Sequence, residues 1–76
     1  MITVEELSQL KTFGRESDGS FSDRWQFSII PKNKKHTKWG LYFLSEVDGE
    51  IEFIKELDDM DDLRDIYYVI TYKKLE

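Results

Sequence analysis

An Asp48-Gly49 pair between two alternating runs is the feature that most constrains how this chain folds. Asp-Gly in this setting is typical of a two-residue type I′ β-hairpin, because both turn residues take a positive φ. The run before the pair, 38–46, has apolar residues on both of its faces, which favours a central strand. The run after it, 50–57, places Ile51 and Phe53 on one side. The sequence therefore predicts an antiparallel hairpin of two strands, 38–46 and 50–57.

Two further elements are predicted before this hairpin. Large apolar and polar residues alternate over 24–30, which indicates a strand, and Pro31 ends it because proline cannot donate to a β-ladder. Near the N-terminus, Thr3 is followed three residues later by Glu6, which is the pattern of a capping box. Apolar residues then recur at helical spacing, so the sequence predicts a helix over 3–13.

The remaining segments complete the expected fold. Residues 14–22 are polar and predict a loop, and residues 58–65 predict a short helix. The run 66–72 is rich in β-branched and aromatic residues, which favours a strand. The alternative is one continuous helix over 58–74. We therefore expect an α+β fold, with an N-terminal helix packed on a four-stranded, mostly antiparallel sheet, in the order helix, strand, strand, strand, short helix, strand.

Length and composition limit the class of protein. The 76 residues are enough for one small α+β domain, which we expect to span 1–76, and five Phe, four Tyr and two Trp supply its core. The chain has no cysteine, which excludes disulfides and cysteine zinc sites. It has neither the pattern of a secretory signal nor an apolar run of about 20 residues that could span a membrane. We therefore expect a cytoplasmic protein that does not enter membranes.

Charge is distributed unevenly along the chain. The net charge is −5 at pH 7, and residues 46–65 carry ten acids against two bases. Such a distribution bears on partners rather than on fold. A ridge of carboxylates could also imitate nucleic-acid phosphates in the basic groove of a DNA-binding enzyme. We expect a protein-binding surface that comprises Glu46, Asp48, Glu50, Glu52, Asp58, Asp61, Asp62, Asp65, Tyr68 and Tyr72.

No pattern in the sequence indicates catalysis or a cofactor. The acidic segment 58–65 lacks the alternating ligands and the central glycine of an EF-hand, which leaves weak calcium or magnesium binding as a minor alternative to a solvated acidic face. His36 lies among lysines, with no carboxylate close in sequence to orient it. The serines occur in no nucleophile motif. We therefore predict no enzyme activity, no cofactor and no dedicated metal site.

A second charged segment is basic. Lysines with aromatic neighbours can bind single-stranded nucleic acid. The sequence pI of about 4.8 is the opposite of the usual nucleic-acid-binding footprint, so this stays an alternative. The loop concerned carries Lys32, Lys34, Lys35 and Lys38.

The function predicted from these observations is a small, acidic, non-enzymatic module that binds a protein partner. A role as a bacterial or phage accessory or inhibitor protein suits a chain of this size and composition. Two alternatives remain: a structural protein that forms a homo-oligomer through an uncovered sheet face or edge, and a nucleic-acid-binding domain that uses the lysine loop.

Overall fold

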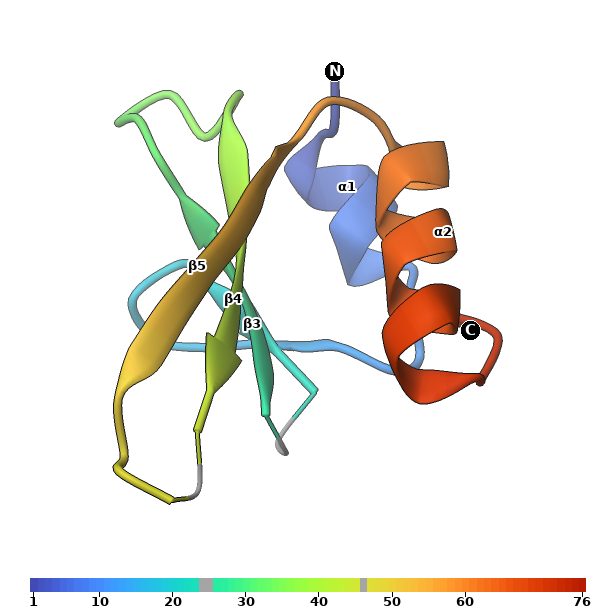
Figure 1. The fold of residues 1–76 in the computed structure, drawn as a ribbon. Helices are drawn as coiled ribbons and strands as arrows, with labels where there is room; N and C mark the ends of the chain where they lie inside the picture. The colour runs from blue at the N-terminus through green and yellow to red at the C-terminus, as the bar shows by residue number, and fades with distance from the viewer. Residues whose placement is uncertain (24–25, 46) are drawn as a thin grey trace.

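The structure, a computed structural model, describes residues 1–23, 26–45 and 47–76. Its main feature is a five-stranded antiparallel sheet, in which each strand pairs with the next along the chain (Figure 1). The strands are β1 (Gly14–Arg15), β2 (Phe21–Ser22), β3 (Phe27–Pro31), β4 (Trp39–Leu44) and β5 (Ile51–Leu57). The helices are α1 (Val4–Ser8) and α2 (Met60–Thr71). Both helices lie on the same side of the sheet (Figure 1).

The predicted fold was wrong in its helices and in the number of its strands. The expected N-terminal helix 3–13 is a piece of five residues, and the longer helix lies at the C-terminus. Residues 66–72, predicted as a strand, belong almost entirely to α2, so the alternative of a helix over 58–74 is closer. The predicted loop 14–22 contains the short strands β1 and β2. The sheet therefore has five strands rather than four.

The start of α1 agrees with the helix predicted over 3–13, whereas its end differs from that prediction. Thr3 Oγ1 accepts the backbone N–H of Glu6 at 3.1 Å, and Glu6 Oε1 accepts the N–H of Thr3 at 3.0 Å, which confirms the capping box. The N–H of Leu10 bonds the carbonyl of Leu7, three residues back, at 3.2 Å. The chain leaves the α-helical path there while Leu10 stays buried. A helix this short depends on packing, which the fully buried Leu7 supplies.

In α2, burial outweighs local β-propensity. Asp59 caps the helix, because its Oδ1 accepts the N–H of Asp62 at 2.8 Å. Met60, Leu63 and Tyr67 recur at helical spacing and are all buried. One continuous helix places these three side chains on the same face, whereas β-propensity depends on a neighbouring strand to pack against. Within the part of the chain that the structure describes, no helix is long and apolar enough to cross a membrane.

The hairpin of β4 and β5 is confirmed, with a longer turn than predicted. Leu44 pairs with Ile51, and the N–H of Ser45 donates to the carbonyl of Glu50 at 2.9 Å. Four residues therefore lie between Ser45 and Glu50, whereas a type I′ hairpin has two. Gly49 takes a φ of 72°, and its N–H donates to the carbonyl of Ser45 at 2.9 Å. The positive φ that the sequence predicted for the glycine is present in this wider turn.

Strand β3 corresponds to the predicted strand 24–30. Arg24 and Trp25, at the start of that prediction, lie outside the described residues. Pro31 is the last residue of β3 and pairs with Trp39 of β4. Proline at the end of a strand is the expected position, because the missing N–H costs no ladder bond in the middle of the sheet.

The core lies between the two helices and one face of the sheet. Ile29, Trp39 and Leu41 are fully buried on the sheet side, and Leu7 and Leu63 meet them from the helices. Residues two apart in a strand share a face, so the intervening residues point to the opposite side. A separate aromatic contact lies on this second face of the sheet.

On the second face, Tyr42 and Phe53 are cross-strand neighbours. Their ring centroids lie 5.3 Å apart in an edge-on arrangement, and Phe53 is half exposed. The ammonium of Lys32 lies 4.4 Å from the centroid of the Phe53 ring, which is within cation–π range. Gly40 lies beneath this cluster, since a Cβ there would come within 2.9 Å of Tyr42 Cε1.

Candidate functional site

The predicted acidic surface is divided between two ends of the sheet. Asp48, Glu50 and Glu52 lie at the hairpin end of β5, and the remaining acids lie at the start of α2 (Figure 1). The seven residues of β5 separate the two groups by about 20 Å at the usual rise of a strand. The two groups therefore do not form the continuous ridge that mimicry of nucleic acid needs. The second group comprises Asp58, Asp61, Asp62 and Asp65; Glu46 lies outside the described residues.

Two acids elsewhere in the chain, Asp48 and Asp18, accept hydrogen bonds within turns. Asp48 accepts the N–H of Glu50 at 3.0 Å inside the hairpin turn, and this bond lowers the pKa of the Asp48 carboxyl. Asp18 accepts both the hydroxyl and the N–H of Ser20, at 2.6 and 2.9 Å, which lowers the pKa of Asp18. These carboxylates hold turns, so they are less available to a partner than their exposure suggests.

The acids at the start of α2 also have local partners. Asp62 lies 3.4 Å from the ammonium of Lys55 on β5 and accepts the N–H of Asp58 at 3.2 Å. Asp61 lies 3.5 Å from Arg64, one turn along the helix. Asp65 has neither kind of contact among the described residues, and it is exposed. Of this group, the exposed carboxylates of Asp58 and Asp65 are therefore the most available to another molecule, and Asp65 is the one that lies on α2 itself.

Of the two predicted tyrosines, Tyr68 lies on the outer side of α2 and Tyr72 is the residue at its C-terminal cap. Tyr68 is 52% exposed and Tyr72 is 81% exposed. Two further apolar side chains of the same helix are exposed beside them, Val69 at 68% and Ile70 at 43%. Sequence reasoning missed Val69 and Ile70, because a strand over 66–72 would have buried one side of this run. The helix instead presents a concentrated apolar surface in its second half.

The predicted lysine loop joins β3 to β4, and its four lysines are all exposed. Lys32 turns to the second face of the sheet, where it contacts Phe53. The loop itself is shaped by Asn33, whose Oδ1 accepts the N–H of Thr37 at 3.0 Å. Its histidine, His36, is half buried and packs edge-on against Trp39, with ring centroids 5.8 Å apart. The histidine therefore contributes packing at this loop rather than lying wholly in solvent.

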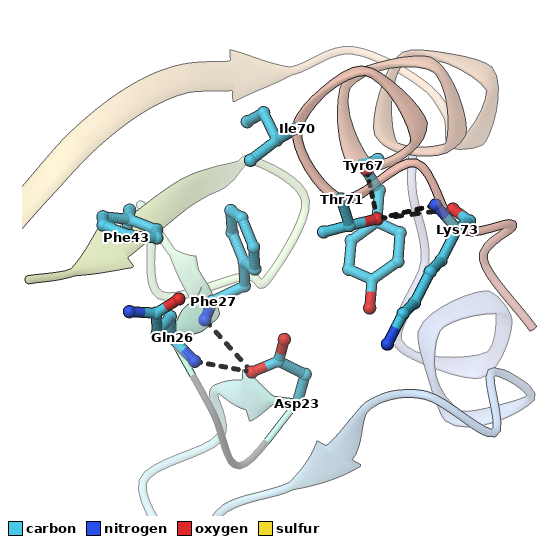
Figure 2. Close-up of a pocket in the computed structure, with 8 residues that line it drawn as sticks. All are labelled: Asp23, Gln26, Phe27, Phe43, Tyr67, Ile70, Thr71 and Lys73. Atoms are coloured by element: carbon cyan, nitrogen blue, oxygen red, sulfur yellow. Dashed lines mark hydrogen bonds between the residues drawn. The ribbon is translucent and has the colours of Figure 1, made fainter.

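A cleft opens between the second half of α2 and the sheet (Figure 2). Figure 2 shows Ile70 on the helix side of the cleft, with Phe27 and Phe43 on the sheet side. Its volume is about 220 Å³. The lining residues come from β3, β4, the segment before β3 and the C-terminal end of α2. They are Asp23, Gln26, Phe27, Phe43, Tyr67, Ile70, Thr71 and Lys73.

Aromatic rings form the floor of this cleft. Phe27 meets Phe43 edge-on at 5.3 Å between centroids, and it meets Tyr67 in the same manner at 5.7 Å. Tyr67 in turn contacts Phe13 at 5.9 Å. Edge-on contacts of this kind stabilise the rings beyond their burial, so the floor is a fixed surface rather than a set of loose side chains.

Polar groups gather at the mouth of the cleft. Asp23 Oδ1 accepts the backbone N–H groups of Gln26 and Phe27, at 3.1 and 3.0 Å, which fixes the carboxylate there (Figure 2). Burial raises the pKa of the Tyr67 phenol, and the negative charge of Asp23 raises it further. Lys73 supplies a positive charge to the same mouth. An aromatic floor with both charges at its rim can hold an apolar group that carries a polar end.

A second, shallower hollow continues from the cleft along α2. Its volume is about 300 Å³, and its lining comprises Asp65, Ile66, Val69 and Ile70. Ile70 lines both hollows, so the two adjoin at this side chain. Together they extend from the core-facing to the solvent-facing side of the helix. The outer hollow is lined by α2 alone, whereas the lining of the inner cleft comes from elements that are far apart in the chain, so no sequence signal brings the residues of that cleft together.

The described residues bring together no group of three His, Cys, Asp or Glu side chains that could hold a metal ion. Comparison of the chain with protein-family models, with curated proteins and with solved structures finds no match in any of the three.

Proposed function

We propose that this chain is a small, non-enzymatic module that binds another protein through the second half of α2. The observation that carries the proposal is the cluster of exposed apolar side chains on that helix. Contiguous exposed apolar surface costs solubility and typically marks an interaction site. We call this cluster the α2 surface; it comprises Asp65, Tyr68, Val69, Ile70 and Tyr72.

The composition of the α2 surface supports protein binding. Tyrosine is enriched at the centres of protein interfaces, because its ring buries area while its hydroxyl keeps a polar partner. Tyr68, Tyr72 and Asp65 belong to the surface predicted from the sequence, and Val69 and Ile70 add the apolar part that a partner would desolvate. Asp48 and Glu50 lie in the hairpin turn, at the other end of β5, so we assign them solvation rather than contact.

We propose the cytoplasm as the location, because the sequence contains no cysteine. The accessory or inhibitor role in bacteria or phage stays a prediction from size and composition. A small binding module of this kind would act by covering a surface of its partner, which agrees with such a role.

Self-association is the second candidate, and β5 is the element that favours it. This strand lies at the edge of the sheet, where one side of its backbone has no partner strand among the described residues. Its Glu52, Lys55 and Glu56 and the irregular register beside Leu41 and Tyr42 are devices that typically prevent strands from pairing at an edge. We therefore rank a different protein above a second copy as the partner.

Site-specific photo-crosslinking tests the proposal. Val69 and Val47 are both exposed valines, at 68% and 98%, and they lie on α2 and on the hairpin turn respectively. A benzophenone amino acid replaces one or the other in cells that express the chain naturally. We expect a discrete adduct with one partner from position 69, and none of that adduct from position 47. Identical adducts from both positions, or none from position 69, would contradict the proposal; an adduct of twice the chain's mass would favour self-association.

A further inference from the structure

The two hollows adjoin at Ile70, and we call them together the groove; its lining is largely apolar. The inner part is floored by Phe27, Phe43 and Tyr67, and the outer part is lined by Ile66 and Val69. The rings of the inner part are fixed by their edge-on contacts, so the floor exists before any ligand arrives. Preformed apolar floors bind with less loss of conformational entropy than surfaces that must first be ordered.

The size of the inner part indicates what kind of group it can take. Its volume of about 220 Å³ lies below the range of roughly 300–1,000 Å³ that is usual for small-molecule and cofactor sites. One large apolar side chain fits such a space better than a cofactor does. The outer part is open along the helix, which leaves room for the chain on which that side chain is carried.

Carboxylates are placed along this groove. Asp23 lies at the inner mouth and Asp65 lines the outer part. Glu52 is exposed and pairs with Phe43 across β4 and β5, and directly paired residues point to the same face, which places Glu52 beside the floor. Lys73 contributes one positive charge at the inner mouth. Among the described residues that border the groove, negative charge therefore exceeds positive charge.

We infer that the groove binds a short cationic segment of a partner protein, with one large apolar side chain in the inner part and flanking lysines or arginines beside the carboxylates of Glu52 and Asp65. This inference rests on the proposed function and adds the chemistry of the partner. The apolar anchor supplies most of the affinity, because it is the part that is fully desolvated. The charges select the partner and speed its association, and their contribution falls as salt rises.

Peptide titration followed by amide NMR tests this inference on the intact chain. The probes are three synthetic peptides: acetyl-KKLFKK-amide, acetyl-EELFEE-amide with the same anchor and opposite charge, and acetyl-KKSSKK-amide with the same charge and no anchor. We expect the first peptide to shift the amides of Phe43, Ile70 and Thr71. We expect the other two to bind at least about tenfold more weakly, because each lacks one of the two contributions.

Variants assign the binding to the groove. Ile70→Ser removes the side chain shared by both hollows while it leaves the fully buried core untouched, and it is expected to weaken the first peptide at least about tenfold. Val47→Ser, at an exposed valine on the hairpin turn, is the matched control and is expected to leave binding unchanged. The double variant Glu52→Gln, Asp65→Asn is expected to reduce the preference for the cationic over the anionic peptide and to flatten its dependence on salt.

Several results would overturn the inference. They are equal affinity for the cationic and the anionic peptide, shifts confined to the lysine loop or to the second face of the sheet, and no shift at millimolar peptide. Shifts at the groove amides on raising the concentration of the chain alone, with no peptide response, would assign the groove to a second copy. If position 69 gives a discrete crosslink but the cationic and anionic peptides bind equally well, the proposed protein-binding function stands and the cationic partner is rejected.

Discussion

The indole N–H of Trp39 donates a hydrogen bond of 3.1 Å to the backbone carbonyl oxygen of Ile2, 37 residues earlier in the chain. Both residues are buried, with exposures of 0% and 1%. The bond joins the segment before α1 to β4, an interior strand of the sheet. It also satisfies a carbonyl that water cannot reach, so the contact fixes the N-terminal segment as well as filling the core.

Replacement of Trp39 by phenylalanine is expected to be strongly destabilising. Trp39→Phe leaves the Ile2 carbonyl without its donor and opens a space beside the ring. We expect the free energy of unfolding to fall by about 2–4 kcal/mol, measured by urea denaturation. Val47→Ala, at an exposed position, is the control and should change stability by less than about 0.5 kcal/mol. A loss below about 1 kcal/mol for Trp39→Phe would mean that the hydrogen bond is not formed.

Two glycines offer a matched test of the second face of the sheet. A Cβ at Gly40 would lie 2.9 Å from Tyr42 Cε1 and 3.2 Å from Phe53 Cε1, whereas a Cβ at Gly14 meets no atom within 4 Å. Gly40→Ala is therefore expected to displace the two rings and to cost about 1–2 kcal/mol. Gly14→Ala should be neutral or slightly stabilising, because it restricts the unfolded chain. Equal effects in thermal denaturation would contradict the close approach at Gly40.

The features that could be predicted from the sequence are those made by neighbours in the chain. The capping box of Thr3 and Glu6 was confirmed because both partners lie within one helical turn. The hairpin at Asp48-Gly49 was confirmed for the same reason, although its turn is wider. Residues 66–72 were assigned wrongly, because their β-propensity is strong locally while the burial of Tyr67 depends on the whole sheet.

The site was harder to predict than the elements. The ten acids of 46–65 are adjacent in the sequence, but an extended strand between them carries the two ends about 20 Å apart. Conversely, Asp23, Phe43 and Ile70 are distant in the sequence and line one cleft. Such a cleft depends on where α2 crosses the sheet, and no local pattern encodes that position.

Two adjacent aspartates at the start of α2, Asp58 and Asp59, differ in their side-chain hydrogen bonds. Asp59 caps the helix through the N–H of Asp62, whereas the Asp58 side chain makes no hydrogen bond or ion pair within the described residues. Asp59→Ala is expected to lower the free energy of unfolding by about 1 kcal/mol. Asp58→Ala removes one of several like charges and should change stability little. Equal losses in urea denaturation would show that general charge, rather than the cap, determines the stability of this helix start.

The buried phenol of Tyr67 makes the free energy of unfolding depend on pH in the alkaline range. Burial, and then the charge of Asp23, raise the pKa of its phenol above the ordinary value of 10.0. Because the folded pKa lies above the unfolded one, the neutral phenol's contribution to stability is complete below pH 10 and is lost as pH rises through the folded pKa. We expect the free energy of unfolding to fall above pH 10, by at most about 1.4 kcal/mol per pH unit from this group.

Tyr67→Phe separates this effect from the titration of lysines, which both proteins share. The variant is expected to show a flatter loss of stability between pH 10 and pH 11.5, measured by urea denaturation at fixed ionic strength. Tyr72→Phe is the control, because Tyr72 is 81% exposed and meets similar surroundings in the folded and unfolded chain. It should keep the slope of the natural protein. The same slope in Tyr67→Phe would show that the Tyr67 phenol reaches water, and that the cleft is open to its floor.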